Sequence, residues 1–272
     1  MQNLSHRNVN LGSLSIYFAL FALVIAPLTA NAQSAEEIGL QIATEARQKQ
    51  YGFVNYTASL TMILRNKQGK ESTRKVRLKV LEVEEDGDFS LFVFDQPRDV
   101  KGTAFLVHAH KFEPDEQWLY LPALKRVKRI SSSKQSGSFM GSEFAYEDLG
   151  AVEVEKYTYT FLRDEPCGEL QCAVLERVPV SADSGYSRHL VWYDREELRV
   201  QQVHFFDRRN AHLKTMALEN YEKYLENYWQ ASKITMVNHL TGKSTDMLWS
   251  DLEFKTDLDE SNFTQTAIKR IR

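Results

Sequence analysis

Cysteine is scarce in this chain, and so are apolar runs long enough to span a membrane. The 272 residues include two cysteines, six prolines and twelve glycines. The longest apolar stretch, Leu11–Ile25, is shorter than the roughly 20 residues that a spanning helix needs. The sequence therefore predicts neither a disulfide-rich scaffold nor a protein that crosses the bilayer with helices.

The first 32 residues have the pattern of a secretory signal peptide. His6 and Arg7 precede the apolar stretch, and Ala30-Asn31-Ala32 forms an A-x-A cleavage site. We expect cleavage after Ala32, with an uncleaved anchor as the alternative. No cysteine lies near the site, so lipid attachment there is not expected. Residues 33–272 are then predicted to be a single exported domain.

Excess positive charge is also missing. Residues 1–32 contribute only Arg7 to the charge, so residues 33–272 carry 33 Lys and Arg against 37 Asp and Glu, a net charge of −4. An exported, slightly acidic protein is a poor candidate for binding nucleic acid.

Motifs of hydrolytic enzymes are absent as well. The chain has no G-x-S-x-G, no H-E-x-x-H and no S-x-x-K with its partner motifs. His108 and His110 would share one face of a strand and could bind a metal with a third ligand, but we favour the interpretation that they are two strand-end histidines beside a polar turn. We predict no catalytic residue, no metal site and no cofactor, and keep an exported hydrolase as an alternative.

What the chain does contain is alternation of apolar and polar residues. Ser34, Glu37 and Gly52 mark one amphipathic helix with a capping box and a glycine stop. After it the period changes to two, and "RKVRLKVLEV" predicts a strand with one apolar and one basic face. Strands are predicted over 56–64, 74–83, 89–94, 103–109, 117–121, 126–130, 157–162, 172–178, 186–193, 200–206, 214–224, 229–237 and 244–254. This series predicts a meandering antiparallel sheet that curls into a barrel or partial barrel.

Cys167 and Cys172 have four residues between them, including a glycine. They can close a hairpin loop, and an oxidising compartment favours the bond. Two free thiols or a redox pair is the alternative, although the C-x-x-C spacing is missing.

The longest interval without strand periodicity is 131–152, and it begins within the run "LKRVKRISSSK" (124–134), whose basic residues mostly precede it. The basic residues of that run fall on both faces of a strand, so they suit an exposed edge strand or attraction to an anionic partner. Gly137 and Gly141 enclose Phe139 and Met140 but lack the P-loop pattern. The Phe-Met pair suits either an adaptable apolar contact or a plug in the protein's own core.

Four segments resemble the LolA-like outer-membrane lipoprotein-sorting proteins. They are "DVKGTAFL" (99–106), "QWLYLPALKRVKRI" (117–130), "SGSFMGSEFAYEDL" (136–149) and "ESNFTQTAIKRI" (260–271). The resemblance implies a mainly β fold, one antiparallel sheet curled into a half-open barrel, with a few helices covering a concave face that holds acyl chains.

The function implied by this resemblance is non-catalytic carriage of lipoprotein or lipid cargo in the periplasm of a Gram-negative bacterium. An RND-type transporter of the inner membrane is an implied partner, and a role as its accessory protein is the alternative. Contact with the membrane itself would be transient. From the matching segments we predict these cargo or partner contacts: Trp118, Tyr120, Phe139, Met140, Phe144 and Tyr146.

Overall fold

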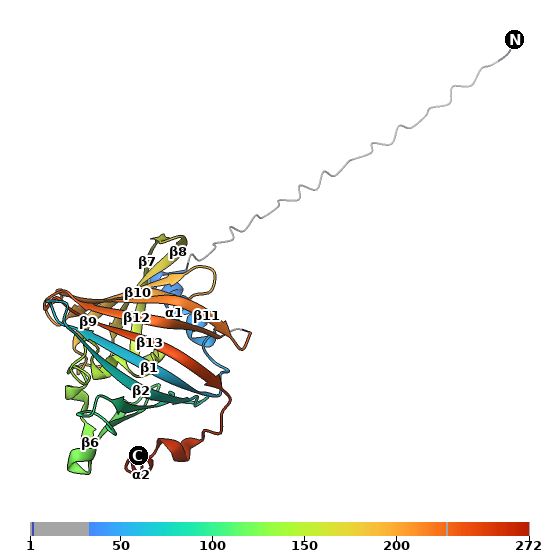
Figure 1. Ribbon diagram of the computed structural model, residues 1–272. Coiled ribbons are helices and arrows are strands. Elements are labelled where there is room, and N and C mark those ends of the chain that lie inside the picture. The colour runs from blue at the N-terminus through green and yellow to red at the C-terminus, as the bar shows by residue number, and fades with distance from the viewer. Residues whose placement is uncertain (1, 3–32, 227, 272) are drawn as a thin grey trace. The chain divides into compact units, whose positions relative to one another are not determined.

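The first and last strands of the chain pair with each other, and this pairing joins two antiparallel meanders into one sheet (Figure 1). The computed structural model describes residues 2, 33–226 and 228–271. Within those residues the sheet has 13 strands in the order β6-β5-β4-β3-β2-β1-β13-β12-β11-β10-β9-β8-β7. The prediction of a signal peptide falls outside the described residues, apart from residue 2.

The elements follow the predicted segments closely. Their bounds are α1 Ala35–Gln48, β1 Asn55–Arg65, β2 Glu71–Leu81, β3 Phe89–Gln96, β4 Ala104–His108, β5 Glu116–Leu121, η1 Pro122–Leu124, β6 Arg126–Ile130, η2 Ser132–Lys134, η3 Tyr146–Asp148, η4 Val154–Lys156, β7 Tyr157–Cys167, β8 Leu170–Pro179, β9 Tyr186–Asp194, β10 Val200–Asp207, β11 His212–Tyr224, β12 Tyr228–Asn238, β13 Lys243–Phe254, η5 Glu260–Phe263 and α2 Gln265–Ile268.

The helix α1 begins at the predicted capping box. The Ser34 hydroxyl accepts from the backbone N–H of Glu37 at 3.1 Å, and the Glu37 carboxylate accepts from the backbone N–H of Ser34 at 2.8 Å. A Cβ at Gly39 would lie 2.8 Å from the backbone nitrogen of Phe161. The helix therefore contacts the backbone of β7 so closely that only glycine fits there.

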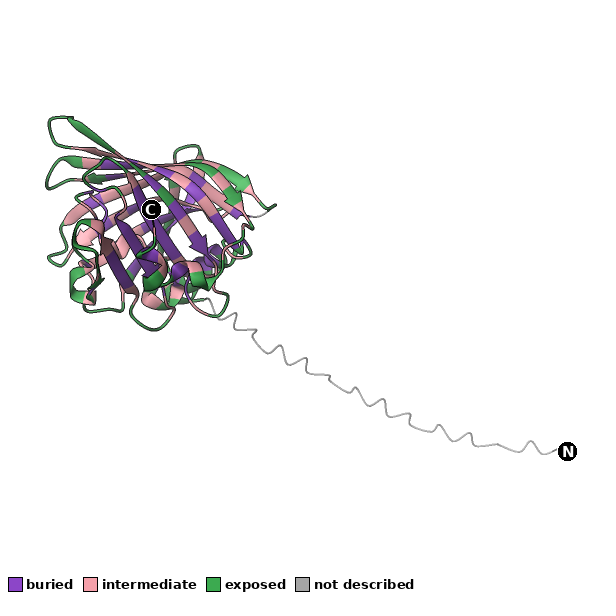
Figure 2. Cartoon of the chain, turned by 60° about the horizontal axis from the view of Figure 1, so that its bottom comes forward, coloured by how far each residue is buried: buried purple, intermediate pink, exposed green. Residues whose placement is uncertain are grey.

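Alternation along the strands separates an inner from an outer face. On β2, Val76 and Leu78 are buried while Arg77 between them is exposed, as the sequence predicted. The buried inner residues of most strands join with α1 in one large apolar cluster. Figure 2 shows the buried positions along the middle of the strands and the exposed ones at the hairpin ends.

A second, smaller apolar cluster lies on the outer face of β2–β5. Phe263 of η5 and Ile268 of α2 are fully buried there against Leu106 and Trp118. The C-terminal segment thus covers the outside of the sheet, whereas α1 belongs to the inner cluster.

The sheet does not close into a barrel, because its edge strands β6 and β7 are not hydrogen-bonded to each other in the described part of the chain. Residues 131–156 connect these two edges without a further strand. The predicted fold class, one antiparallel sheet curled into a half-open barrel, is confirmed. No helix within 33–226 and 228–271 is both long and apolar enough for a membrane span.

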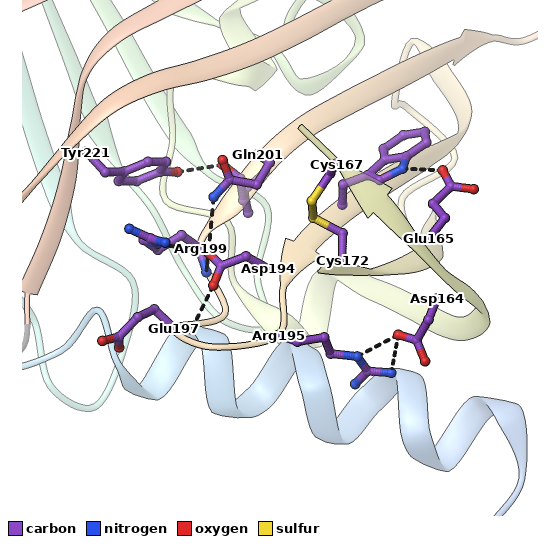
Figure 3. Close-up of a disulfide and its surroundings, with 12 residues drawn as sticks. Asp164, Glu165, Cys167, Cys172, Asp194, Arg195, Glu197, Arg199, Gln201 and Tyr221 are labelled. Carbon is purple, nitrogen blue, oxygen red and sulfur yellow. Dashed lines mark hydrogen bonds and ion pairs between the residues drawn. A yellow bond between two sulfur atoms is a disulfide. The ribbon is translucent and has the colours of Figure 1, made fainter. Parts of the chain in front are cut away.

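A disulfide joins Cys167 and Cys172 across the hairpin between β7 and β8 (Figure 3). The bond lies in a small apolar cluster with Val174 and Trp192, separate from the inner cluster that contains α1. Arg195 pairs with Asp164 at 2.6 Å, and Arg199 donates to the buried Asp194 at 2.8 Å. The first contact connects β7 to the turn after β9, and the second holds that turn to the end of β9.

Candidate functional site

Residues 131–150, which we call the covering loop, lie over the inner face of the sheet. Phe139 of this loop is fully buried, and its ring centroid lies 5.1–6.0 Å from those of Phe92, Phe94 and Phe105. Aromatic rings at such distances attract one another in addition to the area that they bury. The loop therefore packs onto the β3–β4 half of the sheet through its central phenylalanine.

Polar contacts fasten the other side of the covering loop to β11, β12 and β13. The Lys214 ammonium contacts the Asp148 carboxylate at 2.7 Å, and both side chains are 4% exposed. Asn238 donates to the Glu143 carboxylate at 2.7 Å, and the Glu143 backbone N–H donates to Thr245 at 3.0 Å. The loop thus bridges strands from both halves of the sheet.

A cavity of about 250 Å³ remains between the end of α1, the covering loop and the inner face of the sheet. Most of its lining is apolar, and it includes Leu78, Phe92, Phe144, Ile234, Met247 and Trp249. Ligand pockets in proteins are usually about 300–1,000 Å³. The cavity is therefore large enough for part of an alkyl chain, and a larger occupant would require movement of the covering loop.

One end of the cavity is charged. Arg47 of α1 donates to Glu153 at 2.7 Å and to Asp88 at 3.1 Å, and both carboxylates are buried. Burial raises the pKa of Asp88 from its ordinary value of 3.8 to about 6, although the Arg47 guanidinium opposes the shift. The arrangement places two carboxylates against one guanidinium beside an apolar cavity.

The predicted contact residues lie in different places. Phe144 lines the cavity, Phe139 is buried beneath the covering loop, and Met140 and Tyr146 are partly buried against the inner cluster. Trp118 and Tyr120 belong to the outer cluster, on the face of the sheet opposite the cavity. Their contacts with cargo or a partner remain predictions.

Five histidines lie in two places, and a sixth, His189, is buried and accepts from Arg177 at 2.9 Å. His108 bonds to the backbone oxygen of Phe263 at 2.7 Å, and His110 pairs with Asp86 at 2.6 Å. His204, His212 and His239 come together outside the cavity lining, with neighbouring ring centroids 4.5 and 4.4 Å apart. No group of three His, Cys, Asp or Glu in the described residues is arranged to hold a metal ion.

Sequence reasoning missed the charged end of the cavity. Arg47 lies four residues after Ala43 on the buried face of α1, and Asp88 directly precedes the buried strand β3. The sequence contained two signals. One is a charged residue on the apolar face of a helix, and the other is an acidic residue directly before a buried strand. Neither signal identifies its partner, because Arg47 is 41 residues from Asp88 and 106 from Glu153.

Solved structures of other proteins have the same architecture. A domain described as an outer membrane lipoprotein-sorting protein, from Vibrio parahaemolyticus, is 52% identical, with a TM-score of 0.85 over 86% of this chain and 100% of that one. A DUF1329 family protein from Desulfovibrio piger is 27% identical, with a TM-score of 0.82 over 87% and 100%. A LolA superfamily protein from Nitrosomonas europaea, 19% identical, has a TM-score of 0.68 over 86% and 99% and so shares the fold.

A family model described as that of an uncharacterized protein matches residues 86–270. No curated protein matches the chain. The Vibrio domain is matched over its whole length at more than half identity. The chain belongs to the family of outer-membrane lipoprotein-sorting protein domains and shares its fold with the LolA superfamily protein.

Proposed function

We propose that this protein is a periplasmic carrier that holds an acyl chain of lipidated cargo in the cavity between α1 and the covering loop and helps sort that cargo to the outer membrane. The apolar lining of this cavity is the observation that supports the proposal most. Each methylene group buried there gains about 0.8 kcal/mol, so an apolar concavity binds alkyl chains without further chemistry.

We propose that the carrier is non-catalytic. The described lining of the cavity contains one serine, Ser90, and no histidine, cysteine or lysine. A serine nucleophile is activated by a hydrogen bond to a neighbouring base. Within the described residues no hydrogen bond joins the Ser90 hydroxyl to a base, and the nearby Asp88 carboxylate accepts from Arg47 instead.

Delivery requires that the cargo leave again. The covering loop connects the two edge strands and takes no part in the ladder between neighbouring strands, so it can shift while the sheet stays paired. A partner that binds the shifted loop more tightly than the closed one would drive release.

A role as accessory protein of an inner-membrane RND-type transporter is the second candidate. Phe112 and Val180 are 82% and 66% exposed and line a separate cavity of about 290 Å³, together with the turn that precedes β5 and η4. Exposed apolar side chains around a hollow are typical of protein contact sites. A photo-crosslinker at Phe112 should label the transporter in cells, whereas one at the exposed Leu240 should not; labelling at neither position would contradict this candidate alone.

The carrier function is tested by placing a charge in the cavity. Ile234→Glu puts a carboxylate into the apolar lining and should weaken binding of an alkyl ligand at least about tenfold. Val237→Glu on the same strand is the matched control, because Val237 is exposed and outside the lining. Binding is measured with a neutral probe such as N-phenylnaphthylamine, whose fluorescence rises in apolar sites. Equal probe binding by both variants would contradict the proposal.

A further inference from the structure

One oxygen of Asp88 has no hydrogen-bond partner at the charged end of the cavity. Its Oδ2 accepts from Arg47, while Oδ1 is buried and unpaired within the described residues. Asp88 as a whole is 6% exposed, and it lines the cavity. A buried acceptor without a partner costs about 1–3 kcal/mol, and a charged one costs more.

The Arg47 guanidinium is held between two carboxylates. It contacts Glu153 through Nη2 and Nε, at 2.7 and 3.3 Å, and Asp88 through Nη2 at 3.1 Å, and it stacks over the Tyr51 ring at 4.3 Å. An anionic group at this end of the cavity would therefore meet the Asp88 carboxylate beside a cation whose charge Asp88 and Glu153 already balance. A hydrogen-bond donor would meet an acceptor that lacks a partner.

The strand β3 leads from this polar end into the apolar part of the cavity. Asp88, Ser90 and Phe92 lie at alternate positions and all line the cavity. On the neighbouring strand Val80 pairs with Ser90 and Leu78 pairs with Phe92. Along β3 a ligand thus passes from the Asp88 carboxylate to the apolar side chains of Leu78 and Phe92, which matches the polarity of an alkyl chain with a headgroup.

We propose that the cavity binds amphiphiles whose headgroup donates a hydrogen bond to Asp88 Oδ1, such as an ammonium, amide or hydroxyl group, in preference to amphiphiles with an anionic headgroup. This inference rests on the carrier function proposed above and assigns the headgroup end of the same site. Because the pKa of Asp88 is raised to about 6, the carboxyl is ionised at pH 8 and gains most from a donor.

The test compares three ligands with the same chain, each displacing N-phenylnaphthylamine from residues 33–272 at pH 8. Dodecylammonium carries a charge and N–H donors, dodecyltrimethylammonium carries the charge alone, and dodecanoate is an anion. A hydrogen bond to a charged acceptor is worth about 1.5–3 kcal/mol, so dodecylammonium should bind at least about tenfold more tightly than the trimethyl compound. Dodecanoate should bind most weakly.

Substitution of Asp88 identifies the group responsible. Asp88→Ala should bring the three affinities together, and Asp88→Asn should improve dodecanoate binding. The control is Asp95→Ala, because Asp95 lies on β3 but is partly exposed, paired with Arg77 and outside the cavity lining. Near-ultraviolet circular dichroism checks that each variant is folded. If Asp88→Ala unfolds, the test is carried by Asp88→Asn, which keeps the shape of the side chain.

Each outcome bears on one claim or both. If no ligand displaces the probe, the carrier function fails and this inference fails with it. If all three ligands bind equally, or if the donor preference survives in Asp88→Ala and Asp88→Asn, the headgroup assignment is overturned while the carrier function stands.

Discussion

The ammonium of Lys214 on β11 lies 2.7 Å from the carboxylate of Asp148 on the covering loop, and both side chains are buried. Lys214 also donates to the backbone oxygen of Glu143 at 3.0 Å and lies over the rings of Tyr186 and Phe205. This pair fixes the loop to the half of the sheet farthest from Phe139. Closure of the cavity therefore depends on an ion pair on one side and an aromatic cluster on the other.

Removing one partner of this pair should loosen the covering loop. Lys214→Met leaves the Asp148 carboxylate buried without its cation, so the free energy of unfolding should fall by about 3–5 kcal/mol. Urea denaturation measures the change. Arg77→Ala, which breaks the exposed pair with Asp95, should cost less than about 1 kcal/mol. Similar losses in both variants would contradict a structural role for the buried pair.

Phe139 should act chiefly through the core. Phe139→Ala removes a fully buried ring and should destabilise the protein by about 3–5 kcal/mol. Phe112→Ala removes a ring that is mostly exposed and should change stability by less than about 0.5 kcal/mol. Thermal and denaturant unfolding compare the two. A Phe139→Ala protein as stable as wild type would mean that the ring is a replaceable contact and no core plug.

Stability should depend on pH through Asp88, which faces Arg47, Glu153, Tyr56 and Tyr228. Its pKa is about 6 in the folded protein and near 3.8 when unfolded, so the folded state holds the proton more tightly. The resulting stabilisation is complete below about pH 4 and is lost as the pH rises through 6, by up to about 3 kcal/mol.

The variant Asp88→Asn isolates this contribution, because it has no titrating group at that position. Relative to wild type, its free energy of unfolding should rise between pH 5 and pH 8. The measurement is denaturant unfolding of both proteins across that range. A constant difference between them would contradict a raised pKa at Asp88.

The disulfide should stabilise only modestly. Cys167 and Cys172 close a very short loop, so replacing both with serine should cost about 2 kcal/mol at most. Urea denaturation of the double variant measures this loss, and alkylation before and after reduction confirms that the thiols are bonded in the native protein. A loss well above that value would show that the bond also supports the packing of Val174 and Trp192 around it.

Local patterns were sufficient to predict the elements. The capping box at Ser34 and the alternation in β2 depend on neighbours a few residues apart, and the structure confirms both. Alternation also predicts that a strand has two faces, but not which face lies inside a curved sheet. Trp118, which was predicted as a contact from the family resemblance, packs on the outer face against Phe263, and its contact with cargo or a partner stays a prediction.

The site depends on contacts between distant parts of the chain. Arg47 lies on α1, Asp88 lies directly before β3, and Glu153 lies in the segment after the covering loop. No sequence spacing links these three residues. His204 and His212 lie on two different strands and His239 lies directly after a third, and they show no metal-ligand spacing in the sequence. The three rings lie together because of the β10–β11 and β11–β12 hairpins. A correct prediction of the strand register would therefore have placed them side by side.

The carrier function is tested most directly by native mass spectrometry of the protein purified from its own periplasm without detergent. The measured mass should exceed that of residues 33–272. Organic extraction should remove the excess mass and release an acylated molecule, and the Ile234→Glu variant should show no excess mass. A polypeptide of bare mass that also fails to take up N-phenylnaphthylamine would contradict the carrier function.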